Sequence, residues 1–319
     1  MPKLTEDQAV ALLPDARKNA PRPEGLVYLM IAPPKWGKTT TFCDVPNALL
    51  LAFERGYQFQ SCPTIFIDCW EDPKFVPYTD EEGVNHMTMR QAMEVLTATD
   101  KFDFIIIDTA DMAAKKCSDY FLGKNGWSHP QDGGDFGKGY DIVQNAPFRT
   151  MIGAIMGTGR GVAFITHSEV KTAAFAKGAK AKRETSLPGG IHKFLHSQAD
   201  VIMHGSFGRK TDEGYRERVI QTEGDEETLA GSRCKTVNIP PKFIVEPSRP
   251  WLQWCKFFTD PKAADAATKA FSKVEEEEDD EPETISKDEP ATQLASQRKQ
   301  SVKTDSADTA DKPQTKKKA

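Results

Sequence analysis

Continuous apolar runs bounded by polar or turn residues recur along the first two thirds of the chain. They are rich in Ile, Val, Leu and Phe, and they show little of the polar alternation of a half-exposed strand. Such runs are typical of strands buried on both faces, as in a mostly parallel sheet covered by helices. The predicted strands are residues 26–31, 48–53, 64–69, 102–107, 161–166 and 200–204.

Segments between these runs place apolar residues at helical spacing, on one side of a helix. The segments are residues 87–97, 110–122 and 143–156. Strands that alternate with helices predict an α/β fold, with a mostly parallel sheet sandwiched by helices.

The pattern changes after residue 204. Residues 215–221 alternate between apolar and polar, and residues 233–245 look extended and rich in turn residues. We therefore expect antiparallel strands at one edge of the sheet. Residues 263–271 have the spacing of a last helix.

Composition separates the end of the chain from the rest. From Lys273 on there are almost no large apolar residues, and the segment opens with an acidic run at 275–281 and closes with lysines at 316–318. Such a sequence cannot bury enough surface to offset the entropy of ordering it. We expect a helical lead-in over 1–23, one folded domain over 24–272 and a disordered tail over 273–319.

Charge and cysteine content limit the class of protein only weakly. The net charge is −5, and most of it lies in the tail, so it neither favours nor excludes a nucleic-acid partner. The six cysteines form no C-x-x-C pair, and we see no signal segment, which favours a reducing, cytoplasmic setting. No apolar run approaches the roughly 18 residues of a membrane span.

The most specific motif follows the first predicted strand. Its sequence, Ala-Pro-Pro-Lys-Trp-Gly-Lys-Thr, fits the phosphate-binding loop pattern G/A-x-x-x-x-G-K-T between a strand and a helix. The alternative is a chance strand-turn-helix, but strand, spacing and final threonine all agree. We expect this loop to bind ATP, through Ala32, Pro33, Pro34, Lys35, Trp36, Gly37, Lys38, Thr39 and Thr40.

Individual residues of the loop have different expected roles. Lys38 would reach the β- and γ-phosphates, and the Thr39 hydroxyl would join the Mg²⁺ shell. The two prolines stiffen the loop because each fixes its φ near −65°. For Trp36 we favour packing over a role as a ligand platform.

Three polar residues follow other apolar strands and are candidates for the rest of the site. Asp108 ends the run 102–107 and is expected to hold Mg²⁺ through its water shell. Glu54 follows the run 48–53 and could orient the attacking water, although a solvated glutamate at a strand end is an equal alternative. His167 follows the run 161–166 and could sense the γ-phosphate by hydrogen bonding.

In this order the motifs resemble the RecA-like family of recombination ATPases, especially the phage-encoded branch associated with single-strand annealing and binding. The likeness covers roughly residues 24–247. It implies that Glu54 is the catalytic base, Asp108 the Walker B carboxylate and His167 the sensor. The Gly-Lys-Gly-Tyr run at 137–140 is similar to a segment of these phage ATPases.

The same resemblance implies a homo-oligomer, ring or filament, with nucleotide between subunits and a basic residue supplied in trans. Arg233 is the candidate for that arginine finger, with Lys235 in reserve. An ordinary surface arginine is the alternative.

A basic segment after His167 is the candidate DNA-binding region. In the resembled family the loop at this place contacts DNA; here an aromatic ring among lysines could stack a base while the lysines neutralise phosphates. A solvated surface loop is the alternative. The candidate residues are Lys171, Phe175, Lys177, Lys180, Lys182 and Arg183.

The function that these motifs favour is an ATP-hydrolysing, Mg²⁺-dependent protein that binds single-stranded DNA and assists annealing or strand exchange in phage recombination or replication. A nucleotide-gated scaffold or loader with negligible hydrolysis is the alternative, and a RecA-fold helicase-type motor has the same core motifs. A small-molecule kinase is disfavoured because no arginine-rich lid is seen. The acidic tail could compete with DNA for the basic segment or dock a replication protein, and a merely solubilising tail is an equal alternative.

Overall fold

The computed structural model describes residues 22–171, 182–211 and 214–279. Contacts within the chain divide it into two units, residues 1–275 and 276–319. The elements described below belong to the first unit, except for the last residues of the final helix. No helix in the described ranges is long and apolar enough to cross a membrane.

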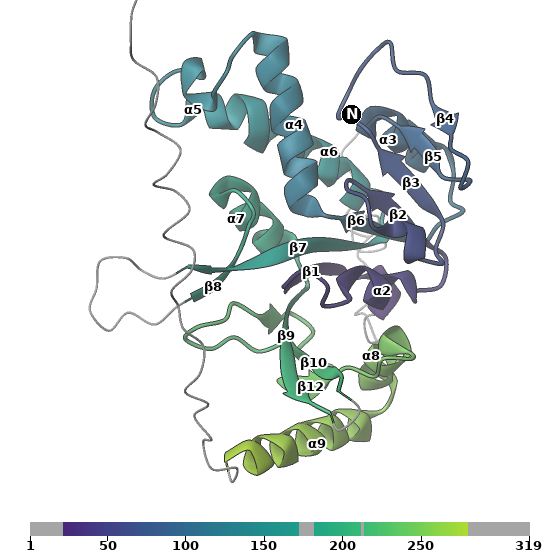
Figure 1. The fold of residues 1–319 in the computed structure, drawn as a ribbon, viewed down its shortest axis with the longest axis vertical. Coiled ribbons are helices and arrows are strands. Elements are labelled where there is room, and N and C mark those ends of the chain that lie inside the picture. The colour runs from purple at the N-terminus through teal and green to yellow at the C-terminus, as the bar shows by residue number, and fades with distance from the viewer. Residues whose placement is uncertain (1–21, 172–181, 212–213, 280–319) are drawn as a thin grey trace, which may run out of the picture. The chain divides into compact units, whose positions relative to one another are not determined.

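A single sheet organises the first unit (Figure 1). Its main path runs β12-β10-β9-β1-β7-β6-β2-β3-β5-β4, while β8 pairs with β7 and β11 pairs with β9. The strands are β1 Val27–Ala32, β2 Ala48–Ala52, β3 Thr64–Ile67, β4 Tyr78–Thr79, β5 Asn85–Met87, β6 Phe104–Asp108, β7 Gly161–Lys171, β8 Lys182–Thr185, β9 Val201–Lys210, β10 Arg216–Gln221, β11 Gly231–Ser232 and β12 Lys242–Ile244.

The centre of the sheet is parallel, from β9 through β1, β7, β6, β2 and β3 to β5. Antiparallel strands β10 and β12 complete the edge beside β9, as predicted, and β4 adds a short antiparallel strand at the other edge. The predicted fold class is therefore confirmed. The strand before the phosphate loop lies in the middle, between β7 and β9.

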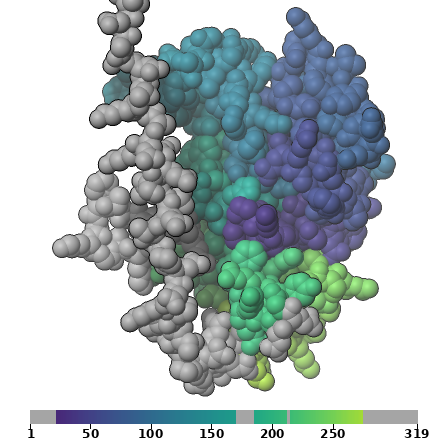
Figure 2. All heavy atoms as spheres, viewed as in Figure 1, coloured from purple at the N-terminus to yellow at the C-terminus, as the bar shows by residue number. Residues whose placement is uncertain are grey.

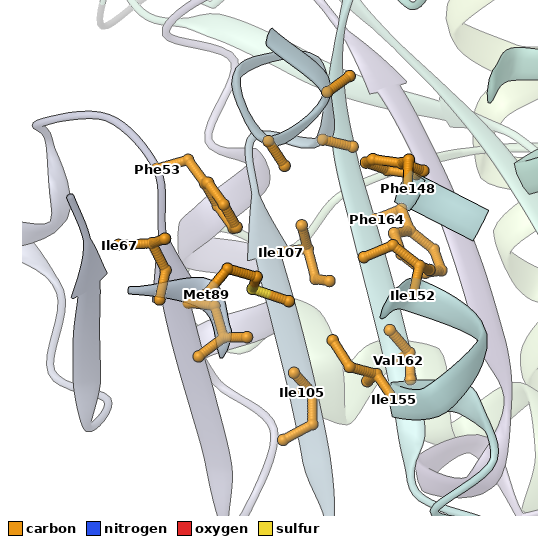
Figure 3. Close-up of a cluster of buried hydrophobic side chains, with 14 of the residues drawn as sticks. Phe53, Ile67, Met89, Ile105, Ile107, Phe148, Ile152, Ile155, Val162 and Phe164 are labelled. Carbon is orange, nitrogen blue, oxygen red and sulfur yellow. The ribbon is translucent and has the colours of Figure 1, made fainter. Parts of the chain in front are cut away.

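Alternating side chains of the apolar strands supply two separate cores. On β6, Ile105 and Ile107 point to one face of the sheet, and Phe104 and Ile106 point to the other. Each face must then be covered, because neither can be left in water. Figure 3 shows the first of these cores, where Ile105 and Ile107 meet side chains that include Phe148.

Helices cover both faces. Residues of α3, α4, α6 and α7 contribute to the first core, and residues of α2, α8 and α9 to the second. Their bounds are α2 Lys38–Cys43, α3 Met89–Ala98, α4 Ala110–Asn125, α5 Lys138–Tyr140, α6 Ala146–Met156, α7 Gly189–Gln198, α8 Pro250–Thr259 and α9 Pro261–Asp279. Short helical turns occur at Pro23–Gly25, Tyr57–Phe59, Pro130–Gly133 and Asp141–Asn145.

Two parts of the structure differ from the sequence predictions. Helix α8 was not predicted, although Pro250 at its first position and the buried Trp251, Trp254 and Phe257 are a helix signal after a turn. Helix α9 continues past Lys273 into the acidic run, because alanine, lysine and glutamate are good helix formers. Residues 1–21 and 280–319, which include most of the predicted lead-in and tail, lie outside the described residues.

The segment after His167 is also more regular than predicted. Residues 168–171 extend strand β7 and pair antiparallel with β8, so Ser168 lies opposite Thr185. The expected basic loop therefore starts and ends in a β-hairpin, which the structure describes over residues 168–171 and 182–185. Pairing of this kind depends on a partner strand and not on local composition, which is why the lysine-rich sequence did not reveal it.

Candidate functional site

The phosphate loop connects β1 to α2 in a strained and well-anchored conformation. Lys35 and Gly37 have φ of +63° and +99°, in the left-handed region. The Trp36 side chain is fully buried, and its Nε1 donates a hydrogen bond of 2.7 Å to the Ser206 carbonyl oxygen on β9. The indole thus packs as an anchor, as we favoured, and fixes the loop to the neighbouring strand.

Lys38 is buried and turned back toward its own loop. Its Nζ donates hydrogen bonds of 3.0 Å to the carbonyl oxygens of Ala32 and Pro33. Burial lowers the pKa of the Lys38 ammonium, and the negative charges of Asp108, Asp111 and Glu54 oppose that shift. A cation held this way can exchange two carbonyl partners for phosphate oxygens.

Asp108 and Thr39 meet directly beneath the loop. The Thr39 hydroxyl donates a hydrogen bond of 2.7 Å to Asp108 Oδ2. Burial raises the pKa of the Asp108 carboxyl, and the Thr39 hydrogen bond and the Lys38 charge act against the rise. A hydroxyl and a carboxylate in contact at the end of a phosphate loop suit Mg²⁺, which takes few protein ligands besides phosphate and water.

Glu54 lies beside this pair. It follows Phe53, whose amide donates a hydrogen bond of 2.7 Å to the Asp108 carbonyl oxygen, and its side chain is half-buried. Burial raises the pKa of the Glu54 carboxyl; the charge of His167 lowers it, and the carboxylate of Asp108 raises it further. The parallel strands therefore bring Glu54 and His167 into one electrostatic cluster, as their strand-end positions predicted.

His167 has a partner that sequence reasoning missed. Its Nδ1 lies 2.9 Å from Asp111 Oδ2, and the Ser186 hydroxyl donates a 3.0 Å hydrogen bond to the same oxygen. The hydrogen bond to Asp111 raises the pKa of His167, while burial and the Lys38 charge lower it. Asp111 sits in the first turn of α4, three residues after Asp108, and that spacing was the available signal.

Arg218 is a second residue that sequence reasoning missed. It projects from β10 onto the phosphate loop, so that a Cβ added to Gly37 would lie 2.4 Å from Arg218 Nη1. Figure 2 shows green atoms from the later part of the chain against purple atoms from the first described residues. No side chain or carbonyl in the described part of the chain hydrogen-bonds this guanidinium. Alternation in residues 215–221 was the only sequence signal.

A groove of about 820 Å³ lies next to Arg218. Its volume is within the usual range of small-ligand pockets. Two aromatic side chains on its wall, Phe207 and Tyr215, are 38% and 71% exposed, and Lys35 of the phosphate loop reaches into it. The groove therefore joins the phosphate loop to an aromatic and basic surface.

The finger candidate lies away from this cluster. The Arg233 guanidinium donates to the Ser197 carbonyl oxygen, and its amide donates to the Asp200 carbonyl oxygen at the start of β9. That is the opposite end of the strands from the phosphate loop. A finger acts on a neighbouring subunit, so its role stays a prediction.

The candidate DNA-binding residues fall on and beyond the hairpin. Phe175, Lys177 and Lys180 lie outside the described residues. The structure places the backbone of Lys171 opposite Lys182, with Arg183 next along β8. The described part of the hairpin therefore ends with two basic residues paired in the backbone register.

Comparison with known proteins identifies a family. Residues 24–234 match the family model described as an AAA domain. Among curated proteins, none matches the chain. Solved structures similar to the chain include a KaiC-like protein from Pyrococcus horikoshii OT3, with 13% identity, 70% of this chain and 87% of that chain covered, and a TM-score of 0.35.

A flagellar accessory protein, FlaH from Methanocaldococcus jannaschii, is also similar, with 8% identity, 70% and 86% of the two chains covered, and a TM-score of 0.36. At these TM-scores neither likeness adds to what the family match shows.

Proposed function

We propose that this chain, a member of the AAA-domain family, is a Mg²⁺-dependent ATPase that binds single-stranded DNA in phage recombination or replication and anneals or exchanges strands. The family match supports the ATPase part of this proposal. One observation carries the ATPase part: Lys38, Thr39 and Asp108 lie at one end of the sheet, with Thr39 and Asp108 2.7 Å apart. That arrangement is what a triphosphate and its magnesium require.

The loop would hold ATP through its backbone amides. Lys38 would leave the carbonyls of Ala32 and Pro33 and pair with the phosphates, while Thr39 and Asp108 hold magnesium. When bound, magnesium would neutralise charge that develops on the phosphates.

Glu54 would orient and deprotonate the attacking water. Its raised pKa supports the role, since a stronger base accepts a proton more readily at neutral pH. The imidazole of His167 would hold the γ-phosphate in place by hydrogen bonding.

The groove beside Arg218 would take the nucleoside. Its position next to Lys35 of the phosphate loop supports this, and Phe207 and Tyr215 offer ring faces for a base to stack on. Arg218 would contact the phosphates from the same side.

Single-stranded DNA would bind on the hairpin of β7 and β8. Connectivity supports the idea, because His167 stands directly before the paired part of β7, which ends at Lys171. We further propose a homo-oligomer, ring or filament, in which Arg233 reaches the nucleotide of the next subunit, and an acidic tail that competes with DNA or docks a replication protein.

ATP hydrolysis measured with and without single-stranded DNA tests the proposal. We expect stimulation by DNA, loss of nucleotide binding in Lys38→Ala, and retained binding with hydrolysis slowed roughly 10²–10⁴-fold in Glu54→Gln. Glu81→Gln, an exposed glutamate, is the matched control. Negligible hydrolysis by the wild type, unchanged in Glu54→Gln, would favour the nucleotide-gated scaffold. Absence of DNA stimulation would remove the DNA-dependent role.

A further inference from the structure

One carboxylate oxygen holds both ends of the hairpin root. Asp111 Oδ2 accepts from the Ser186 hydroxyl at 3.0 Å and contacts His167 Nδ1 at 2.9 Å. His167 leads into the paired part of β7, and Ser186 directly follows β8. Helix α4, which carries Asp111, begins two residues after Asp108 of the nucleotide site.

Other bonds at the root are consistent with a fixed junction. The Ser186 amide donates a hydrogen bond of 3.0 Å to the His167 carbonyl oxygen. The hydroxyls of Thr166 and Thr185, both buried, are 2.7 Å apart. The two strands therefore leave the sheet as one unit, and a displacement of β8 would be transmitted to His167.

The contact with Asp111 decides which ring nitrogen of His167 is available. An ionised carboxylate only accepts hydrogen bonds, so Nδ1 must carry the proton that it donates. Nε2 is then the nitrogen left for a ligand, as an acceptor in the neutral ring or a donor in the imidazolium.

The charges around His167 come from several elements. Asp111 on α4 and Glu54 after β2 favour its protonated form, and so does Asp108 on β6, while Lys38 on α2 disfavours it. Burial raises the pKa of Asp111, yet its hydrogen bond and ion pair with His167 leave that pKa below the usual value. Both side chains are partly shielded, at 25% and 18% exposed.

We infer that Asp111 is a positioning residue that directs His167 Nε2 toward the nucleotide site and couples it to the root of the β7–β8 hairpin. The inference rests on the proposed function, because it takes the phosphates of ATP as the group that His167 faces. Asp111 itself touches neither phosphate nor water in this role. Its single oxygen links a nucleotide-facing side chain to the strand that returns from the basic segment.

The chemical test is NMR of the His167 ring in the full chain. Long-range ¹H–¹⁵N spectra of wild type, assigned with His167→Gln, should show Nδ1 protonated in the neutral ring. In Asp111→Asn the imidazole should titrate at a lower pH than in wild type. Asp119→Asn, an exposed aspartate on the same helix that pairs with Lys115, is the matched control and should titrate as wild type.

The coupling is tested by hydrogen exchange and turnover. The Ser186 amide should exchange faster in Asp111→Ala than in wild type or Asp119→Asn, because the shared oxygen is gone. Turnover of Asp111→Asn should fall roughly ten- to hundredfold, the effect of a lost charged hydrogen bond. Because Nε2 can donate to a phosphate oxygen only in the imidazolium, we expect turnover to decline as pH rises through the pKa of His167. That decline should begin at a lower pH in Asp111→Asn than in wild type.

Two results overturn the inference. One is an NMR spectrum of the wild-type protein in which the neutral His167 ring carries its proton on Nε2. This result does not depend on the folding of any variant. The other is an unchanged His167 titration in a folded Asp111→Asn. A wild-type protein that fails to hydrolyse ATP would refute the proposed ATPase function, yet the ring titration and the exchange of Ser186 would still report on Asp111.

Discussion

Gly205 on β9 packs against the phosphate loop so closely that substitution by alanine should displace the loop. A Cβ there would lie 2.7 Å from the Ala32 Cβ, 2.8 Å from Trp36 Cε2 and 2.9 Å from Met30 Cε. The methionine end can move, but the Ala32 Cβ is fixed to β1 and the indole is held by its bond to Ser206. Gly205→Ala should therefore displace the first residues of the loop.

The expected cost follows from these contacts. Overpacking of a filled core costs about 1–3 kcal/mol, and loss of the indole hydrogen bond adds about 1 kcal/mol. Removing a glycine from a strand offsets about 0.5–1 kcal/mol. Gly205→Ala should thus destabilise the fold by about 1–3 kcal/mol and weaken nucleotide binding, because the amides of the loop no longer converge.

Thermal unfolding and titration with a fluorescent ATP analogue measure the two effects. A domain of this size should lose about 2–4 °C in Tm for each kcal/mol. Gly231→Ala is the matched control, since a Cβ on that strand glycine meets nothing within 4 Å. If Gly205→Ala melts and binds nucleotide like Gly231→Ala, the packing of Trp36 does not hold the loop and the reasoning is refuted.

Three further predictions concern charge. The pKa of His167 is raised and that of Asp111 is lowered, so their pair stabilises the fold fully between about pH 3.8 and 6.5. This contribution is lost as pH rises through the folded pKa of His167 or falls through that of Asp111, and Asp111→Asn should therefore flatten a Tm profile measured from below pH 3.8 to above pH 6.5. Arg218→Ala should weaken ATP binding roughly tenfold in a filter assay while leaving the fold intact. If the variant binds ATP as tightly as the wild type, Arg218 does not contact the phosphates. Truncation after Lys273 should raise DNA affinity at low salt, and unchanged affinity would exclude competition by the tail.

The parts of the site that sequence could predict share one property. Asp108, Glu54 and His167 each directly follow a continuous apolar run, and the carboxyl ends of parallel strands meet at one edge of the sheet. The phosphate loop carries its own spacing signature. For these residues, the local sequence pattern and the rules of parallel sheets were sufficient to predict that they lie at one edge of the sheet.

Other residues of the site depend on contacts that no local pattern encodes. Asp111 and Ser186 are far apart in sequence and meet only because β8 folds back along β7. Arg218 reaches Gly37 because β10 lies two strands from β1 in the sheet order. Alternation could show that Arg218 lies on a strand. It could not show which strand lies beside that one or that the Arg218 side chain reaches the phosphate loop.

Hydrophobic period and motif spacing are local properties, and they were sufficient to predict a mostly parallel sheet between helices and a phosphate loop after its first strand. Only the folded structure shows which strand lies beside the loop, how Trp36 anchors the loop on β9, and which carboxylate binds His167. Strand order and side-chain pairing depend on the burial of whole faces and on partners distant in sequence, so they become defined only when the chain has closed around its two cores.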